Sequence, residues 1–220
     1  MPQSRPRNTV RQREAGAAAR LETKRRLLAA AAEEFAAHGY AGATVNQIAG
    51  RAGVTVQTLY LAWGSKRELL RAYLEAALSG QLVVSAAAEL PRLITAELGG
   101  AGVGAGADLV IARMVRLYCQ IAQRAALAWQ LYRDAAASDP AIAEDWVALQ
   151  HLRHQTFTNL IAQLPPASLR TGLSPEAAAD TAWAIASPET YDLLVRIRGY
   201  TLSRYEQWLV DTLGAAILAT

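Results

Sequence analysis

The chain has 220 residues, of which 52% are hydrophobic, so it can fill a core in one large domain or in a small domain joined to a larger one. No apolar run reaches the roughly 18 to 20 residues of a membrane span, the N-terminus lacks the apolar centre of a secretory signal, and the single cysteine, Cys119, excludes an intramolecular disulfide. We therefore expect a soluble, cytoplasmic protein that makes no membrane contact.

The net charge of +3 is distributed unevenly along the chain. Residues 1–26 carry eight basic and two acidic side chains, which leaves a net charge of about −3 for the rest. A basic block of this kind indicates nucleic acid or an acidic surface as partner, although a solubilising tail has the same composition. Because residues 1–20 also lack apolar periodicity and contain two prolines, we predict that they form a basic mobile arm.

The pattern after the arm predicts a first helix and the start of a second. In TKRRLLAAAAEEFAAHGY, Leu27, Ala31 and Phe35 recur every four residues, and Gly39 stands where a left-handed C-terminal cap is expected. A short second helix is expected after Thr44, whose side-chain oxygen can accept a backbone N–H of the first turn.

Two further helix starts follow closely. Thr55 can cap a third short helix in the same way, and Ser65-Lys66-Arg67-Glu68 forms a capping box for a fourth. We therefore place a helical domain at residues 21–66 and treat the fourth helix, residues 66–85, as a connector to the rest of the chain.

The remaining residues also have helical periods. GGAGVGAGAD, residues 99–108, is read as a loop, and a long amphipathic helix follows it. Another helix is expected from Asp139-Pro140 to about Leu164, and SPEAAADTAWAIAS, SPETYDLLVRIRG and SRYEQWLVDTLGAAIL complete the set. No useful length alternates with period two, so we predict an all-α fold of about nine helices.

The segment GVTVQTLYLAWGSK, residues 53–66, carries the strongest functional signal. Ile48, Val54 and Leu59 supply apolar contacts for two short helices that cross steeply against a third, and Gly53 supplies the positive φ of a tight turn. This is the layout of a helix-turn-helix. An ordinary helical corner is the alternative, but a corner does not require the polar residues on its second helix.

Those polar residues suit contact with DNA. On a helix that starts near Thr55, the side chains of Thr55, Gln57, Thr58 and Tyr60 can point outward. Gln57 can form paired hydrogen bonds with adenine, threonine methyls can touch a thymine methyl, and Tyr60 can donate to a phosphate. Lys66 begins the fourth helix, where its charge adds to the positive end of the helix dipole and favours a phosphate.

Residues from about 20 to 75 resemble the TetR/AcrR family of bacterial transcriptional regulators. The resemblance rests on AAAEEFAAHGYAGATVNQIAGRAGVTVQTLYLAWGSKRELL, with its threonine-capped helix, Ala-Gly-Val turn, Thr-Leu-Tyr run and following Lys and Leu-Leu. Val56, Leu61-Ala62 and Trp63 depart from frequent family choices, which affects the expected operator sequence more than the expected DNA binding. The resemblance implies DNA contact by Thr44, Thr55, Gln57, Thr58, Tyr60 and Lys66.

The family usually dimerises through a four-helix interface, which implies a homodimer that binds a palindromic operator in double-stranded DNA. The closing helices suit such an interface, because AAADTAWAIAS is rich in alanine and the last helix carries a stripe formed by Tyr205, Leu209, Thr212, Leu213 and Ala216. The same residues can instead form the core of a monomer.

Family members usually hold a small-molecule pocket in their middle helices. By this resemblance we assign residues 86–220 to effector binding and dimerisation, and we expect a repressor that a small apolar ligand releases from DNA. Aromatic residues at helical spacing also form cores, so the pocket residues are candidates: Met114, Tyr118, Trp129, Phe157 and Trp183.

Signals for an enzyme are weak. His151 and His154 share a helix face, but no acidic or cysteine partner nearby completes a metal site, and the glycine-rich loop lacks the strand and lysine of a phosphate-binding loop. We expect no catalysis, no cofactor and no metal. Two alternatives stay open: a DNA-binding regulator controlled by a protein or by oxidation of Cys119, and a helical interaction module or enzyme.

Overall fold

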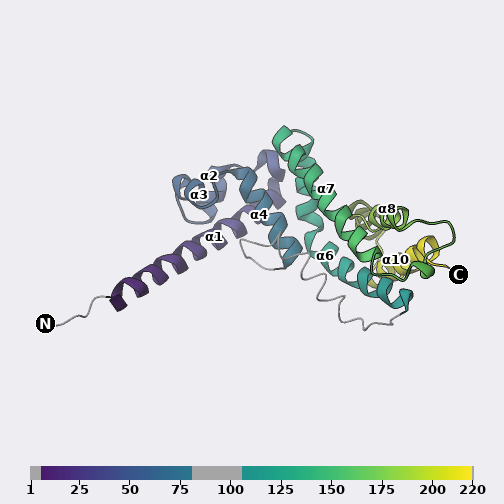
Figure 1. Ribbon diagram of the computed structural model, residues 1–220. Helices are drawn as coiled ribbons and strands as arrows, with labels where there is room; N and C mark the ends of the chain where they lie inside the picture. Colours follow the sequence, from purple (N-terminus) through teal and green to yellow (C-terminus); the bar gives the residue numbers. More distant parts are fainter. Residues whose placement is uncertain (1–5, 81–105, 220) are drawn as a thin grey trace. The chain divides into compact units, whose positions relative to one another are not determined.

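The computed structural model describes residues 6–80 and 106–219, and within them the secondary structure is helical apart from turns and one isolated β-bridge, Leu169 to Leu218 (Figure 1). The predicted all-α fold is thereby confirmed. None of the described helices is long and apolar enough to cross a membrane. The chain divides into two compact units, Met1–Tyr73 and Leu74–Thr220, and the division falls within helix α4 (Lys66–Ser79).

Helix α1 (Pro6–Gly42) is longer than the sequence pattern predicts. It begins at Pro6, where a fixed φ suits the first helical residue and a missing N–H leaves no bond unmade. The described part of the expected arm, residues 6–20, is therefore helical, and nearly all side chains from residue 11 to 20 are exposed. A helical segment that buries so little has no apolar period, which is why the pattern placed the helix start too late.

The end of α1 differs from the expected cap. Gly39 has a φ of 67° and a ψ of 174° and bends the helix there. The positive φ agrees with the prediction, but the ψ value lies outside the left-handed helical region, so the predicted cap geometry is wrong.

The next three helices begin where the capping residues predict. Thr44 precedes α2 (Val45–Arg51), and its hydroxyl and backbone N–H complete a capping box with Gln47. Thr55 precedes α3 (Val56–Trp63), and Ser65 accepts a hydrogen bond from the backbone N–H of Glu68 at the start of α4. Helix α4 ends at Ser79, before the predicted residue 85. Residues 81–105, which hold most of the predicted glycine-rich loop, lie outside the described residues.

In its described part, residues 74–80 and 106–219, the second unit is built mainly from four helices. In chain order its elements are α6 (Ala107–Ala136), α7 (Pro140–Ile161), the 3₁₀ turn η2 (Pro166–Ser168), α8 (Pro175–Ile185), α9 (Pro188–Tyr191), the π-helical η3 (Asp192–Ile197) and α10 (Leu202–Ile217). The side chains of Asp139, Ser174, Ser187 and Thr201 each accept a backbone N–H bond in the first turn of the helix that follows. These caps account for the helix boundaries in physical terms.

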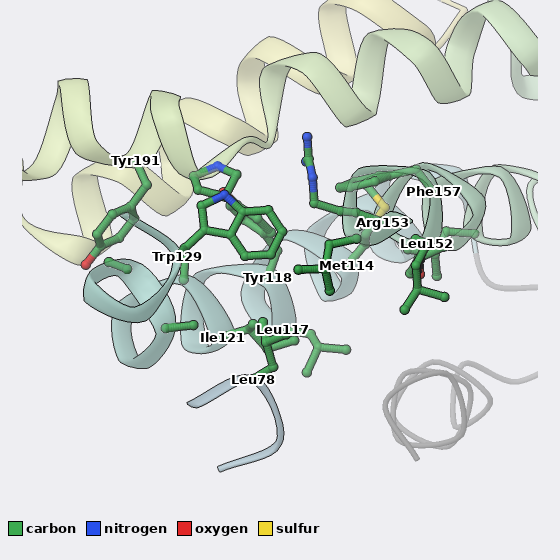
Figure 2. Close-up of a pocket in the computed structure, with 17 residues that line it drawn as sticks. Leu78, Met114, Leu117, Tyr118, Ile121, Trp129, Leu152, Arg153, Phe157 and Tyr191 are labelled. Atoms are coloured by element: carbon green, nitrogen blue, oxygen red, sulfur yellow. Dashed lines mark hydrogen bonds between the residues drawn. The ribbon is translucent and has the colours of Figure 1, made fainter. Parts of the chain in front are cut away.

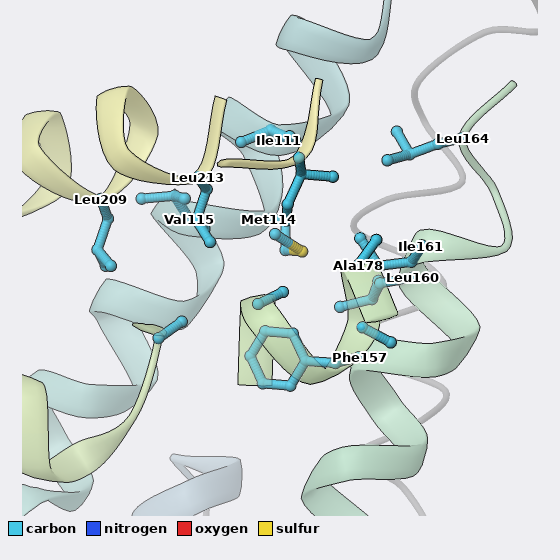
Figure 3. Close-up of a cluster of buried hydrophobic side chains, with 14 of the residues drawn as sticks. Ile111, Met114, Val115, Phe157, Leu160, Ile161, Leu164, Ala178, Leu209 and Leu213 are labelled. Atoms are coloured by element: carbon cyan, nitrogen blue, oxygen red, sulfur yellow. The ribbon is translucent and has the colours of Figure 1, made fainter. Parts of the chain in front are cut away.

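One apolar core joins α6, α7, α8 and α10 (Figure 3). Val115 of α6, Phe157 of α7 and Leu213 of α10 are buried in it, and Ala178 and Ala182 let the backbone of α8 come close. Of the stripe expected to face a second subunit, Tyr205, Leu209 and Leu213 are fully buried within this chain, while Thr212 and Ala216 are half-buried. The three buried side chains therefore belong to the core of the chain, and a contact with a second copy would use other side chains.

Candidate DNA-binding site and effector cavity

The turn between α2 and α3 depends on a glycine. Gly53 has a φ of 64°, as the sequence predicts, and its N–H donates to the carbonyl of Gly50. A Cβ atom at this position would lie 3.3 Å from Nη2 of Arg26, so a side chain would be both strained and crowded. The apolar contacts of the turn are Ile48 and Leu59, which are fully buried.

Polar contacts hold α2 against α1. Arg26 Nε donates to the carbonyl of Ala52, 3.1 Å away, and Arg26 Nη2 donates to the carbonyl of Gly53, 3.2 Å away. Arg51 contacts two carboxylates, Glu33 and Glu34, each at 2.6 Å. The hydrogen bond with Glu34 raises the pKa of Arg51 above its usual value, so the guanidinium stays charged. These contacts fix the position from which α3 is presented.

The outer face of α3 is polar and accessible, as predicted. Gln57 is exposed, and 48% of the surface of Tyr60 is accessible. The hydroxyl oxygens of Thr55 and Thr58 lie 2.9 Å apart and are joined by a hydrogen bond, so the two side chains form one continuous polar patch. Thr44 is also exposed, and its hydroxyl donates to the side chain of Gln47. The structure thus brings together five of the six predicted DNA-contacting residues as accessible or half-buried groups on α2 and α3.

Lys66 has a different environment from the one predicted. Its Nζ atom donates to the carbonyls of Tyr40 and Ala43, at 2.8 and 3.0 Å, and lies 4.2 Å from the centre of the Tyr40 ring. The ammonium group therefore ties the start of α4 to the end of α1. This role of Lys66 could not be predicted from the sequence, because the two carbonyl groups belong to residues more than 20 positions away along the chain.

A cavity of about 120 Å³ lies in the second unit, between α6, α7 and the last turn of α4 (Figure 2). Its wall is almost entirely apolar. Four of the five predicted pocket residues line it: Met114, Tyr118, Trp129 and Phe157. The fifth, Trp183, is not part of the wall and instead packs beneath the guanidinium of Arg153, 4.9 Å from it.

Arg153 is a charged residue of the cavity wall that was not among the predicted pocket residues. Its Nη1 atom donates to the carbonyls of Trp183 and Ala186, at 2.9 and 3.1 Å, which belong to the end of α8. Burial lowers the pKa of Arg153 below its usual value. Its position four residues before Phe157, on the same face of α7, is the signal that could have found it.

Two buried donors on cavity residues differ in their surroundings. Among the described residues, Nε1 of Trp129 is buried without a hydrogen-bond partner, whereas the hydroxyl of Tyr118 lies close to the phenol of Tyr205. Burial raises the pKa of Tyr118 well above its usual value, and the nearby phenol of Tyr205 adds to this shift. Unpaired buried donors are rare, because each one has lost its bonds to water.

The remaining reactive candidates have ordinary environments. Cys119 is buried, and desolvation raises the pKa of its thiol to about 12, so the reactive thiolate is strongly disfavoured. His154 Nε2 lies 2.7 Å from a carboxylate oxygen of Asp180, and His151 is exposed. Across the described residues, no group of three His, Cys, Asp or Glu side chains is arranged to hold a metal ion.

A tight glycine turn before an outward-facing, polar third helix defines a helix-turn-helix protein. A sequence model described as "Bacterial regulatory proteins, tetR family" matches residues 27–73, which include α2 and α3. Over these residues the chain matches this family, and the resemblance drawn from residues of about 20 to 75 is confirmed.

One relative in sequence and two solved structures are similar to this chain. The HTH-type transcriptional repressor SCO4008 of Streptomyces coelicolor (strain ATCC BAA-471 / A3(2) / M145) is 45% identical over 53 residues, and the match spans 24% of this chain and 28% of the relative. NalD, the secondary repressor of the MexAB-OprM multidrug efflux pump in Pseudomonas aeruginosa, superposes with a TM-score of 0.67 at 18% identity, over 89% of this chain and 96% of NalD. SmeT in complex with triclosan superposes with a TM-score of 0.66 at 21% identity, over 90% and 92% of the two chains. Because both identities are below 25%, these superpositions show only that the chain has the same fold as NalD and SmeT.

Proposed function

We propose that the protein is a dimeric, DNA-binding repressor of transcription that a small apolar ligand releases from a palindromic operator. The observation that carries the proposal is the accessible polar face of α3, with Gln57 and Tyr60 held outward on a helix that α1 and α2 fix in place. The basic block of residues 1–26 adds an attraction to phosphate that does not depend on sequence.

Base and phosphate contacts divide between these residues. Gln57 is proposed to read adenine, while Thr44, Thr55, Thr58 and Tyr60 are proposed to contact the backbone. Lys66 already donates to two carbonyls, so we propose that it acts by holding α4 in position beside any phosphate contact it makes. SCO4008, which is 45% identical to this chain over 53 residues, is named as a repressor, and this supports repression as the effect on transcription.

A homodimer is proposed because one helix-turn-helix domain makes few contacts with bases. Two copies related by two-fold symmetry double the number of these contacts. Since Tyr205, Leu209 and Leu213 are buried in the chain, the interface needs other apolar groups. Leu193 and Ile197, four residues apart in η3, leave 56% and 73% of their surfaces exposed. These side chains are the best candidates for contact with a second copy.

The cavity supports control by a ligand. Its volume of about 120 Å³ is close to that of cavities that hold benzene, so it fits a small apolar molecule. The unpaired Nε1 donor of Trp129 favours a ligand that carries a hydrogen-bond acceptor. SmeT, which shares the fold, was solved with triclosan, and this makes triclosan a reasonable first ligand to test.

A route from the cavity to DNA binding is available through α4. Leu78 of α4 lines the cavity, and Arg124 of α6 donates to the carbonyls of Ala77 and Leu78, at 2.9 and 2.6 Å. The same helix begins at Lys66, next to α3 in sequence. We propose that a ligand shifts the last turn of α4 and so favours a state that binds DNA weakly, because a ligand acts only through differential affinity.

The test is selection of binding sequences from random duplex DNA, followed by footprinting. We expect protection of a palindrome of roughly 15 to 30 base pairs, with half-sites about one helical turn apart. The variant Gln57→Ala/Tyr60→Ala should keep its fold and lose the selected site, because both side chains are exposed. The proposal is wrong if no sequence is enriched, or if the protein protects a single half-site as a monomer.

A further inference from the structure

An apolar side chain occupies the centre of the polar face of α3. Leu61 leaves 82% of its surface exposed, more than any other large hydrophobic side chain among the described residues. It lies one turn after Gln57 on the same helix. Leu61 departs from the side chains that are frequent in the family at this position, and no role is yet assigned to it.

Helix geometry places Leu61 and Gln57 farthest from the core. Each residue advances an α-helix by about 100°, so Gln57 and Leu61 each lie about 160° from the buried Leu59, one on either side of the opposite face. By the same measure, Thr58 and Tyr60 lie about 100° from Leu59 on the two flanks. When the outer face of α3 enters a groove, Gln57 and Leu61 reach its floor and the flanking hydroxyl groups reach its edges.

The chemical groups in the major groove of DNA then indicate which group each of these α3 side chains contacts. Phosphates line the edges of the groove and accept hydrogen bonds from hydroxyl groups, which suits Thr58 and Tyr60. The floor presents hydrogen-bonding atoms and one apolar group, the C5-methyl of thymine. A leucine pressed against a cytosine amino group would leave that donor without a partner, which is costly.

We propose that Leu61 contacts the C5-methyl group of a thymine in each half-site, next to the adenine that Gln57 reads. The two side chains together would select A·T pairs at neighbouring positions, Gln57 by hydrogen bonds and Leu61 by apolar contact. This inference rests on the proposed function, since it needs α3 to lie in the major groove.

Uracil provides a test that leaves the protein unchanged, because it differs from thymine only by the missing methyl group. In the selected operator, each thymine is replaced by uracil at symmetric positions in both half-sites, and the equilibrium dissociation constant is measured. At one position we expect binding to weaken about fourfold per half-site, the value of one buried methyl group. The variant Leu61→Ala should bind the thymine operator more weakly and should not distinguish thymine from uracil at that position.

Leu127→Ala is the matched control, because Leu127 is an exposed leucine of α6. It should keep the full preference for thymine, and circular dichroism should show that both variants retain the helical content of the parent protein. Sequence-specific binding that ignores uracil at every position, or a Leu61→Ala protein with an unchanged preference for thymine, overturns the inference but leaves the proposed function intact. Failure to select any sequence contradicts the proposed function itself.

Discussion

Arg26 on α1 donates from Nε to the carbonyl oxygen of Ala52, the residue that caps the end of α2, at 3.1 Å. One side chain thereby fixes the turn that precedes α3. We expect Arg26→Ala to lower the free energy of unfolding by about 1–2 kcal/mol, the lower part of the range for hydrogen bonds to a charged group, since Arg26 is partly exposed. Urea unfolding followed by circular dichroism measures this.

Arg25→Ala removes the same charge from the neighbouring exposed residue and serves as the control for Arg26→Ala. It should change stability by less than about 0.5 kcal/mol, as surface substitutions usually do. Equal losses of stability in the two variants would assign the effect to charge and not to the bonds with Ala52.

Local signals predicted much of the DNA-binding unit. Thr44, Thr55 and Ser65 mark helix starts because a capping hydroxyl bonds to N–H groups only two or three residues away. The positive φ of Gly53 was predictable for the same reason, since it is required by a turn between neighbouring residues. The exposure of Gln57 followed from the helical period around the buried Leu59.

Contacts between distant residues were not predictable in this way. Nothing in the sequence near Lys66 indicates that its ammonium group bonds to the carbonyls of Tyr40 and Ala43. Likewise, Trp183 and Trp129 have similar apolar neighbours in sequence, yet Trp129 lines the cavity while Trp183 supports Arg153 from outside the wall. Packing of several helices decides such details, and a helical period alone does not contain them.

Gln57 and Tyr60 should respond differently to substitution. Gln57→Ala should relax the choice at one base pair, at a cost of about 1–3 kcal/mol on the selected operator, because it removes a paired contact with adenine. Tyr60→Phe should weaken binding to all sequences alike, since it removes a phosphate donor. Affinities for the operator and for a scrambled duplex measure both effects. Equal losses on the two duplexes for Gln57→Ala would contradict its role in base reading.

The N-terminal part of α1 should contribute to the salt dependence of binding. Deletion of residues 1–20 removes five arginines, and we expect the slope of log affinity against log salt to become shallower, because fewer phosphates are neutralised. Arg11→Gln/Arg13→Gln keeps the length of the chain and should give part of the same effect. Arg170→Gln, at an exposed position of the second unit, is the control and should leave the slope unchanged. An unchanged slope after the deletion would make the segment a solubilising tail.

Cys119 should be unreactive in the folded protein. Burial raises the pKa of its thiol to about 12 from an ordinary 9.0, so the folded state holds this proton more tightly than the unfolded state. The stabilisation from the bound proton is complete below pH 9 and is lost as the pH rises towards 12. We expect iodoacetamide at pH 8 to modify the protein quickly in urea and very slowly without it. Rapid modification of the folded protein, with loss of DNA binding, would instead support control by oxidation.

Filling the cavity with a larger side chain should remove the response to a small apolar ligand. Ala126 lines the cavity and is half-buried, so Ala126→Leu places three additional carbon atoms in a space of about 120 Å³. Benzene occupies apolar cavities of this size and stabilises the proteins that bind it, so we expect benzene to raise the melting temperature of the parent protein but not of Ala126→Leu. Ala148→Leu adds the same atoms at an exposed position of α7 outside the wall and should respond to benzene as the parent does. Ala148→Leu should bind the operator with parental affinity, because it touches neither the cavity nor α3. An equal benzene response in all three proteins would show that the cavity is not the binding site.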